Sequence, residues 1–115
     1  MIVTTHQKVD KMDIDNIKQL CTIKAMRWTD HIHMRLIKRN ISIEDIEKSL
    51  LSGEIIEQYP NDYPYPSCLV LGFDANNNHV HVVCGISETE LHLITAYYPN
   101  PVKWSEDFKV RKEQV

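Results

Sequence analysis

The first candidate for chemistry is a run of basic side chains at helical spacing. His31 and Arg35 lie four residues apart, and Lys38 and Arg39 follow one turn later. Residues at this spacing lie on one side of a helix. Near the helix N-terminus, the unpaired backbone N–H groups also favour an anion. The stripe therefore predicts a phosphate-binding surface, and the competing interpretation is an ordinary solvated helix face.

The apolar residues of the same segment favour the first interpretation. Ile32, Met34, Leu36 and Ile37 spread over most of the helix circumference. Such a distribution predicts a helix that is largely buried. A polar stripe on a buried helix is expected to line a groove.

Strand alternation in residues 79–86 separates an apolar face from a polar one. The apolar face consists of Val80, Val82, Cys84 and Ile86. This face is expected to pack on the helices, so His81 points to the opposite, open face.

The strand candidate 91–98 adds two groups to that open face. If Ile94 and Ala96 join the core, then Thr95 and Tyr97 lie beside His81. A basic ring, a hydroxyl and a phenol would then share one half-wet surface. A polar solvent face with cross-strand pairs is the equally weighted alternative.

Metal binding is the competing chemistry for the histidines. His31 and His33 diverge on a helix, because paired ligands there need a spacing of three or four residues. His79 and His81 share a strand face, but no carboxylate or thiol stands at a third position. The sequence therefore predicts no metal site and no cofactor, and Cys84 is expected to be a core residue.

Three helices are expected to position the basic stripe. Asp13, Thr29 or Asp30, and Ser42 are candidate N-caps, and Asn40 is a candidate C-cap because asparagine tolerates the left-handed conformation. Ser42 and Asp45 also resemble a capping box. The predicted helices cover residues 13–24, 30–39 and 43–52.

The period changes to that of strands after Gly53. Strands are predicted at 54–59, 68–74, 79–86 and 91–98, joined by proline-rich or asparagine-rich turns. The expected fold is α+β, with the N-terminal helices packed on a three- to four-stranded antiparallel sheet in a meander. Residues 99–115 begin irregularly and are expected to end in a short helix.

Length and composition place the chain among soluble globular proteins. It has 115 residues, 43% hydrophobic and 25% charged, which fits one domain over 13–115 preceded by a loosely ordered segment 1–12. No apolar stretch is long enough to span a membrane. Three widely spaced cysteines and no apolar leader make a reducing cytoplasm the expected compartment.

Charge is unevenly distributed along the chain. Residues 1–43 hold eight Lys/Arg against four Asp, a net +4, whereas residues 44–115 hold five against twelve Asp/Glu, a net −7. The overall charge of −3 argues weakly against a nucleic-acid partner. The positive part could still meet a polyanion.

Several segments together resemble the bacterial family known as domain of unknown function 4258. The resemblance covers roughly residues 13–111. The segments are Trp28–His31, the His31/Arg35/Arg39 run, Ile41–Asp45, Gly53–Pro60, Pro66–Gly72, His81–Val83, Ile94–Pro99, Trp104 and Arg111.

The resemblance implies a toxin with a nuclease fold of the barnase/EndoU/colicin/RelE type. It also implies a zinc-finger antitoxin protein as partner. Arg111, which belongs to the matching motifs, is counted among the expected phosphate-binding residues.

Two functions from different classes follow. The first is a metal-independent endoribonuclease. His31 and His81 form the acid/base pair, Arg35 clamps the phosphate, and the expected RNA contacts are Lys38, Arg39, Tyr59, Thr95, Tyr97 and Arg111. The second is a non-catalytic module whose basic groove holds an acidic protein partner. Convergence of His31, Arg35 and His81 on one point would favour the enzyme.

Overall fold

The computed structural model describes residues 13–112, so the expectation for residues 1–12 lies outside it. These residues form an α+β fold with three helices and five strands. In chain order the elements are α1 (Ile14–Thr22), β1 (Met26–Arg27), α2 (Asp30–Arg39), α3 (Ile43–Leu51), β2 (Glu54–Tyr59), β3 (Ser67–Phe73), β4 (His79–Ile86) and β5 (Leu91–Tyr97). Within the described part of the chain, no helix is long and apolar enough to cross a membrane.

The predicted helix caps are confirmed. The side chain of Thr29 accepts a hydrogen bond from the Ile32 N–H at the start of α2. Asn40 ends that helix with φ 61°, in the left-handed conformation that asparagine tolerates. Ser42 and Asp45 form a reciprocal capping box at the start of α3.

The sheet has one more strand than expected. Strands β2 to β5 form the predicted antiparallel meander, but the full order is β1-β5-β4-β3-β2, and β1 pairs with β5 in parallel. The three- to four-stranded antiparallel prediction is therefore wrong in this respect, because the sheet is mixed. Strand β1 has only two residues, too few for a hydrophobic period to reveal it.

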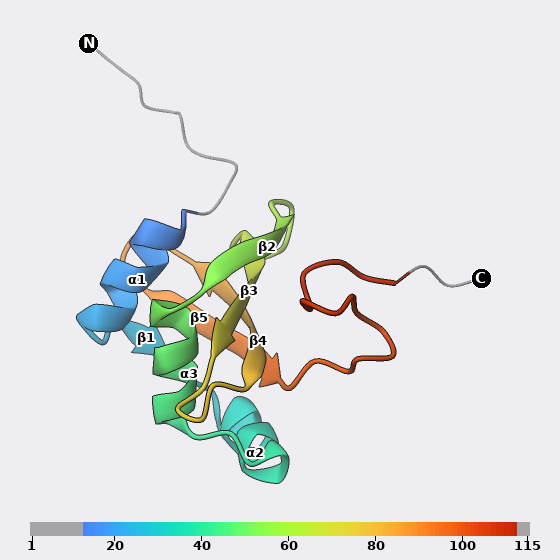
Figure 1. Ribbon diagram of the computed structural model, residues 1–115. Helices are drawn as coiled ribbons and strands as arrows, with labels where there is room; N and C mark the ends of the chain where they lie inside the picture. The colour runs from blue at the N-terminus through green and yellow to red at the C-terminus, as the bar shows by residue number, and fades with distance from the viewer. Residues whose placement is uncertain (1–12, 113–115) are drawn as a thin grey trace.

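Helices cover one face of the sheet, and the C-terminal segment lies on the other side (Figure 1). The closest approach on the helical side is at Gly72 of β3. A Cβ atom there would lie 1.8 Å from the backbone oxygen of Ser49 in α3. The backbones of α3 and β3 are thus in direct contact, and the buried core spreads from this contact to β4 and β5.

A bulge in β5 changes which side chain enters the core. Val83 pairs with Thr95 and Cys84 pairs with Leu93, so Ile94 is the extra residue. Leu93 is 4% exposed and Ile94 is 48% exposed. Ala96 lies in the core as predicted, but the prediction for Ile94 is wrong, because the bulge reverses the alternation before Thr95.

Residues 99–112, the C-terminal segment, form turns rather than the expected short helix. A bridge joins Trp104 to Arg111, and hydrogen bonds between Ser105 and Val110 close a turn between them. Trp104 is only 4% exposed. The segment therefore covers the sheet face that was expected to be open.

Candidate active site

His81 of β4 lies on the sheet face opposite the helices and is fully buried. Its Nε2 is 2.9 Å from the carbonyl oxygen of Phe108, and its Nδ1 is 3.3 Å from the Tyr97 hydroxyl. A carbonyl oxygen only accepts, so Nε2 carries the proton and donates it to Phe108. In the neutral ring Nδ1 then accepts from the Tyr97 hydroxyl. The Trp104 ring contacts the imidazole edge to face, at 4.5 Å between centroids.

Burial sets the charge state of His81. It lowers the pKa of the imidazole, and the Phe108 carbonyl and the nearby Glu57 carboxylate raise it only in part. The charged form is disfavoured because little water reaches the ring. His81 is therefore neutral in the closed structure.

A carboxylate and a guanidinium lie beside this histidine. Arg111 donates from Nε and Nη2 to the two oxygens of Glu57, at 2.8 and 3.1 Å, and the Tyr59 hydroxyl donates to the same carboxylate. The guanidinium of Arg111 also lies 4.7 Å from the centre of the Trp104 ring.

These donors keep Glu57 ionised. Burial alone would raise the pKa of Glu57, but the hydrogen bonds from Arg111 and Tyr59 hold that pKa below its usual value. Burial and the hydrogen bond to Glu57 raise the pKa of Tyr59 to about 12. The pair thus presents a charged carboxylate and a neutral phenol at neutral pH.

A bulge in β2 brings Glu57 and Tyr59 to this face. Ile55 pairs with Val70 and Glu57 pairs with Leu69, which leaves Ile56 as the extra residue. Directly paired residues share a face. Leu69 in turn pairs with Val83 of β4, which lies on the same face as His81, so Glu57 lies on this face too. Without the extra residue, alternation would turn Glu57 toward the helices. Strand periodicity alone therefore could not find Glu57.

Arg39 approaches the same face from the end of α2. Its Nη1 donates to the Thr95 hydroxyl at 3.0 Å and to the Ala96 carbonyl at 2.8 Å. Burial raises the pKa of Tyr97, while the positive charges of Arg111 and Arg39 lower it. Both cations thus lie close enough to Tyr97 to act on its pKa.

The structure brings together six of the nine sequence-predicted site residues, with Glu57 in addition. We call this set the His81 cluster: Arg39, Glu57, Tyr59, His81, Thr95, Tyr97 and Arg111.

The remaining three predicted residues lie on the exposed surface of α2. Within residues 13–112, the side chains of His31, Arg35 and Lys38 make no hydrogen bond or ion pair. The ring contacts of His81 come from β5 and the C-terminal segment instead. The histidine pair and the Arg35 clamp expected around one phosphate are therefore not assembled in this structure.

The prediction that α2 is largely buried is wrong. Ile32 and Leu36 are buried, but Met34 is 60% exposed and Ile37 is 73% exposed. The helix contacts the sheet along one narrow side only, at the edge near β5. His31, Arg35 and Lys38 of the basic stripe consequently lie on the outer surface and do not line a buried groove, whereas Arg39 reaches β5.

The prediction of a half-wet surface around His81 is also wrong. The C-terminal segment covers it with Trp104 and with the Phe108 backbone. The signal for this in the sequence is the pair of aromatic residues Trp104 and Phe108 in a charged tail that has no other aromatic residue. Aromatic side chains at such positions indicate packing onto a partner surface; here Trp104 packs on His81 and Phe108 on His79, both in β4.

The assembled groups are suited to acid–base chemistry on a phosphate ester. A carboxylate and an imidazole can exchange protons, and two guanidinium groups can bind phosphate oxygens by their forked donors. Within residues 13–112, no three His, Cys, Asp or Glu side chains are grouped so that they could hold a metal ion. Cys84 is fully buried in the core, as predicted.

Fold and site define an α+β protein with a helix-covered face and a polar cluster on the opposite face. The family described as "Domain of unknown function (DUF4258)" matches residues 28–98, more than half of the chain. The chain belongs to this family, as its resemblance indicated. No curated protein and no solved structure matches the chain.

Proposed function

We propose that the protein is a metal-independent endoribonuclease whose reaction centre is the His81 cluster. One observation carries the proposal: an ionised carboxylate, an imidazole and two arginines lie on one sheet face. A nuclease-type fold for the α+β architecture is part of the same proposal.

The chemistry divides among the residues as follows. Glu57 accepts the proton of an RNA 2′-hydroxyl, because its carboxylate stays ionised below neutral pH. The 2′-oxygen attacks phosphorus, and the 5′-oxygen leaves with a proton from the His81 imidazolium. Arg111 and Arg39 stabilise the charge on the phosphate oxygens. Each arginine keeps guanidinium N–H groups outside its described hydrogen bonds.

RNA reaches His81 when the turn formed by residues 105–110 moves. This turn places the Phe108 carbonyl on Nε2 of His81, and Phe108 has φ 62°, an uncommon conformation for a bulky residue. An exposed ion pair of 3.1 Å joins Lys109 of the turn to Glu54 of β2, and an exposed pair of this kind adds at most about 1 kcal/mol to the closed position. Movement of the turn wets His81 and removes the burial that lowers its pKa, so the imidazolium can form.

The test is cleavage of total RNA by the purified protein in EDTA, followed by analysis of the new ends. Attack by the 2′-oxygen leaves a 2′,3′-cyclic phosphate and a 5′-hydroxyl. These ends, formed without added metal, support the proposal. Absence of cleavage, or 5′-phosphate products, would contradict it.

The toxin role is proposed on the same basis. Induced expression should arrest bacterial growth, and a Glu57→Gln variant should not. A zinc-finger antitoxin that restores growth when co-expressed is the expected partner. Arrest that persists with Glu57→Gln would separate toxicity from this reaction centre.

A second candidate is a non-catalytic module that binds an acidic protein. The exposed surface of α2 supports it, since His31, Arg35 and Lys38 lie there beside the exposed apolar side chains Met34 and Ile37. An acidic peptide that binds the wild type and not Arg35→Glu, together with no RNA cleavage, would favour this function.

A further inference from the structure

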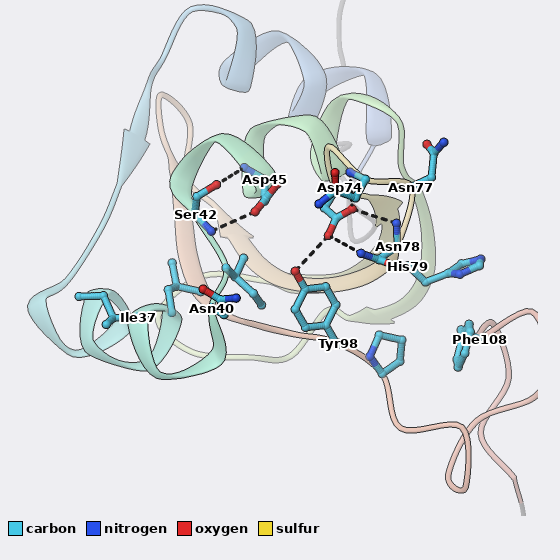
Figure 2. A pocket seen from close by; sticks show the side chains of 14 residues that line it. Ile37, Asn40, Ser42, Asp45, Asp74, Asn77, Asn78, His79, Tyr98 and Phe108 are labelled. Atoms are coloured by element: carbon cyan, nitrogen blue, oxygen red, sulfur yellow. Dashed lines mark hydrogen bonds between the residues drawn. The ribbon is translucent and has the colours of Figure 1, made fainter.

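A cleft of about 980 Å³ opens beside the His81 cluster, where the ends of several elements meet. Figure 2 shows its walls: Ile37 and Asn40 from the end of α2, Asp45 from α3, Asp74 from the β3–β4 turn, Tyr98 after β5, and Phe108. The volume is in the range of small-molecule sites.

One polar wall of the cleft is fixed by Asp74. Its carboxylate accepts hydrogen bonds from the backbone N–H groups of Asn76 and Asn78, from the Asn78 amide and from the Tyr98 hydroxyl. Burial alone would raise the pKa of Asp74, but these four donors hold that pKa below its usual value. The Tyr98 ring is thereby held in place at the cleft (Figure 2).

Asp45 keeps acceptor capacity. Its Oδ1 accepts from the Ala75 N–H and its Oδ2 from the Ser42 N–H, each at 3.2 Å. A carboxylate oxygen has about two lone-pair positions, so each oxygen can accept one more donor. Nearby, the side-chain amide of Asn40 has no hydrogen-bond partner among residues 13–112.

The composition of the cleft selects the ligand. Two carboxylates and no Lys or Arg line it, which disfavours a phosphate and favours a group rich in N–H donors. The aromatic rings of Tyr98, His79 and Phe108, with the apolar Ile37, suit a flat heterocycle. A base with two adjacent N–H donors matches the two free acceptor positions of one carboxylate.

We propose that this cleft binds a guanine base of the RNA substrate, with the Asp45 carboxylate accepting from the N1–H and N2–H groups. The inference rests on the proposed ribonuclease function and adds its base preference. No residue of the His81 cluster lines this cleft, so the proposed reaction centre does not account for it.

The position of the cleft fits a base next to the scissile phosphate. Phe108 forms the boundary, because its ring lies 4.8 Å from that of His79 while its carbonyl accepts from His81. His79 and His81 are two residues apart on β4, so their Cα atoms are separated by roughly 7 Å, comparable to one nucleotide. Movement of Phe108 would make the cleft continuous with the His81 cluster.

The experiment measures binding of guanosine, adenosine, cytidine and uridine to the intact protein by NMR titration. We expect guanosine to bind at least about tenfold more tightly than the others, because paired hydrogen bonds to a carboxylate add one factor of ten or more. Asp45→Asn should remove this preference, because the NH2 group that replaces one carboxylate oxygen donates and does not accept; the remaining amide oxygen still accepts from one of the two backbone N–H groups that Asp45 binds.

A matched pair of α2 variants separates binding from folding. Ile37→Glu places a like charge at the mouth of the acidic cleft and should weaken guanosine binding. Met34→Glu makes the same change at an exposed position outside the cleft lining and should not. Equal effects of the two variants would overturn the inference.

Three further outcomes would also overturn it: no nucleoside binds, guanosine is not preferred, or N-acetylarginine amide binds in place of guanosine, which would indicate a protein partner. The assay needs no cleavage, so the two proposals fail separately. Guanosine binding by a protein that does not cleave RNA overturns the ribonuclease proposal alone. RNA cleavage without guanosine binding overturns this inference alone.

Discussion

At the scale of single residues, the hydrogen bonds of His81 determine which proton it can give or take. The Phe108 carbonyl occupies Nε2 and the Tyr97 hydroxyl occupies Nδ1. A ring held in this way is a neutral structural group while the turn is closed. The same ring becomes a proton donor only when the turn moves, which links the chemistry to a conformational step.

The buried His81 should make stability depend on pH. Burial lowers its pKa in the folded state, whereas the unfolded chain has the ordinary value of about 6.5. As pH falls through 6.5, the unfolded state therefore binds the proton first. The free energy of unfolding should be constant above about pH 7.5 and decrease from there toward pH 5.5.

Urea denaturation at a series of pH values measures this effect. In His81→Gln the decrease should disappear, whereas the exposed His31→Gln should retain it. A wild-type free energy of unfolding that rises as the pH falls over this interval would contradict a lowered pKa.

The sequence predicted the members of the polar cluster better than it predicted the contacts between them. His81, Tyr97 and Thr95 were placed on one face by simple alternation, and the registers confirm that face. The basic stripe predicts His31 as the partner of His81, but His31 lies on the exposed surface of α2 and the ring of His81 contacts Tyr97 and Phe108 instead. Strand alternation does not predict Glu57, because its orientation depends on an inserted residue in β2.

At the scale of elements, caps and turns were readable because their signals are local. Thr29, Asn40 and Ser42 act through residues at most a few positions away. The strand bulges are different, since they arise from packing between partners that are distant in sequence. The C-terminal segment could not be placed for the same reason, because Trp104 packs on a strand more than twenty residues earlier.

The contact between α3 and β3 gives a prediction at this scale. Gly72→Ala places a methyl group where the Ser49 backbone lies, so α3 must move away from the sheet. We expect a loss of at least about 1–3 kcal/mol in the free energy of unfolding, as for other overpacked sites.

Gly85→Ala is the matched control in the next strand. The nearest atom to its added methyl group would be the Pro66 oxygen at 3.3 Å, a tight contact that a small shift relieves. Neither glycine has a positive φ, so the two variants differ in space and not in backbone strain. Equal losses measured by thermal unfolding would contradict the direct contact of α3 with β3.

At the scale of the whole molecule, the two faces of the sheet have different roles. The helical face buries the apolar core, and the opposite face carries the polar cluster under the C-terminal segment (Figure 1). The α+β class followed from the change in hydrophobic period after α3. The sequence did not predict that the C-terminal segment covers the second face, because an irregular segment shows no hydrophobic periodicity.

The uneven charge of the chain predicts how RNA binding responds to salt. Arg35 and Lys38 are exposed on α2, in the part of the sequence with net positive charge. Binding should weaken steeply as salt rises, and Arg35→Glu or Lys38→Glu should each reduce the log–log slope by about one.

Thermal unfolding of these two variants should match the wild type, because the side chains are exposed and unpaired among residues 13–112. Lys48→Glu on the exposed side of α3 is the control and should leave the slope unchanged. An affinity for RNA that does not depend on salt would indicate an apolar interface instead.

The central claim is that the Glu57 carboxylate takes part in metal-independent RNA cleavage. The most direct measurement compares the cleavage rates of Glu57→Gln and Glu54→Gln in EDTA. Both variants remove one carboxylate from β2, but Glu54 pairs with exposed Lys109, outside the His81 cluster. Glu57→Gln should lose about 10²–10⁴-fold in rate, the usual contribution of a general base, and Glu54→Gln should stay close to the wild type. Equal rates for the two variants, or no cleavage by the wild type, would contradict the claim.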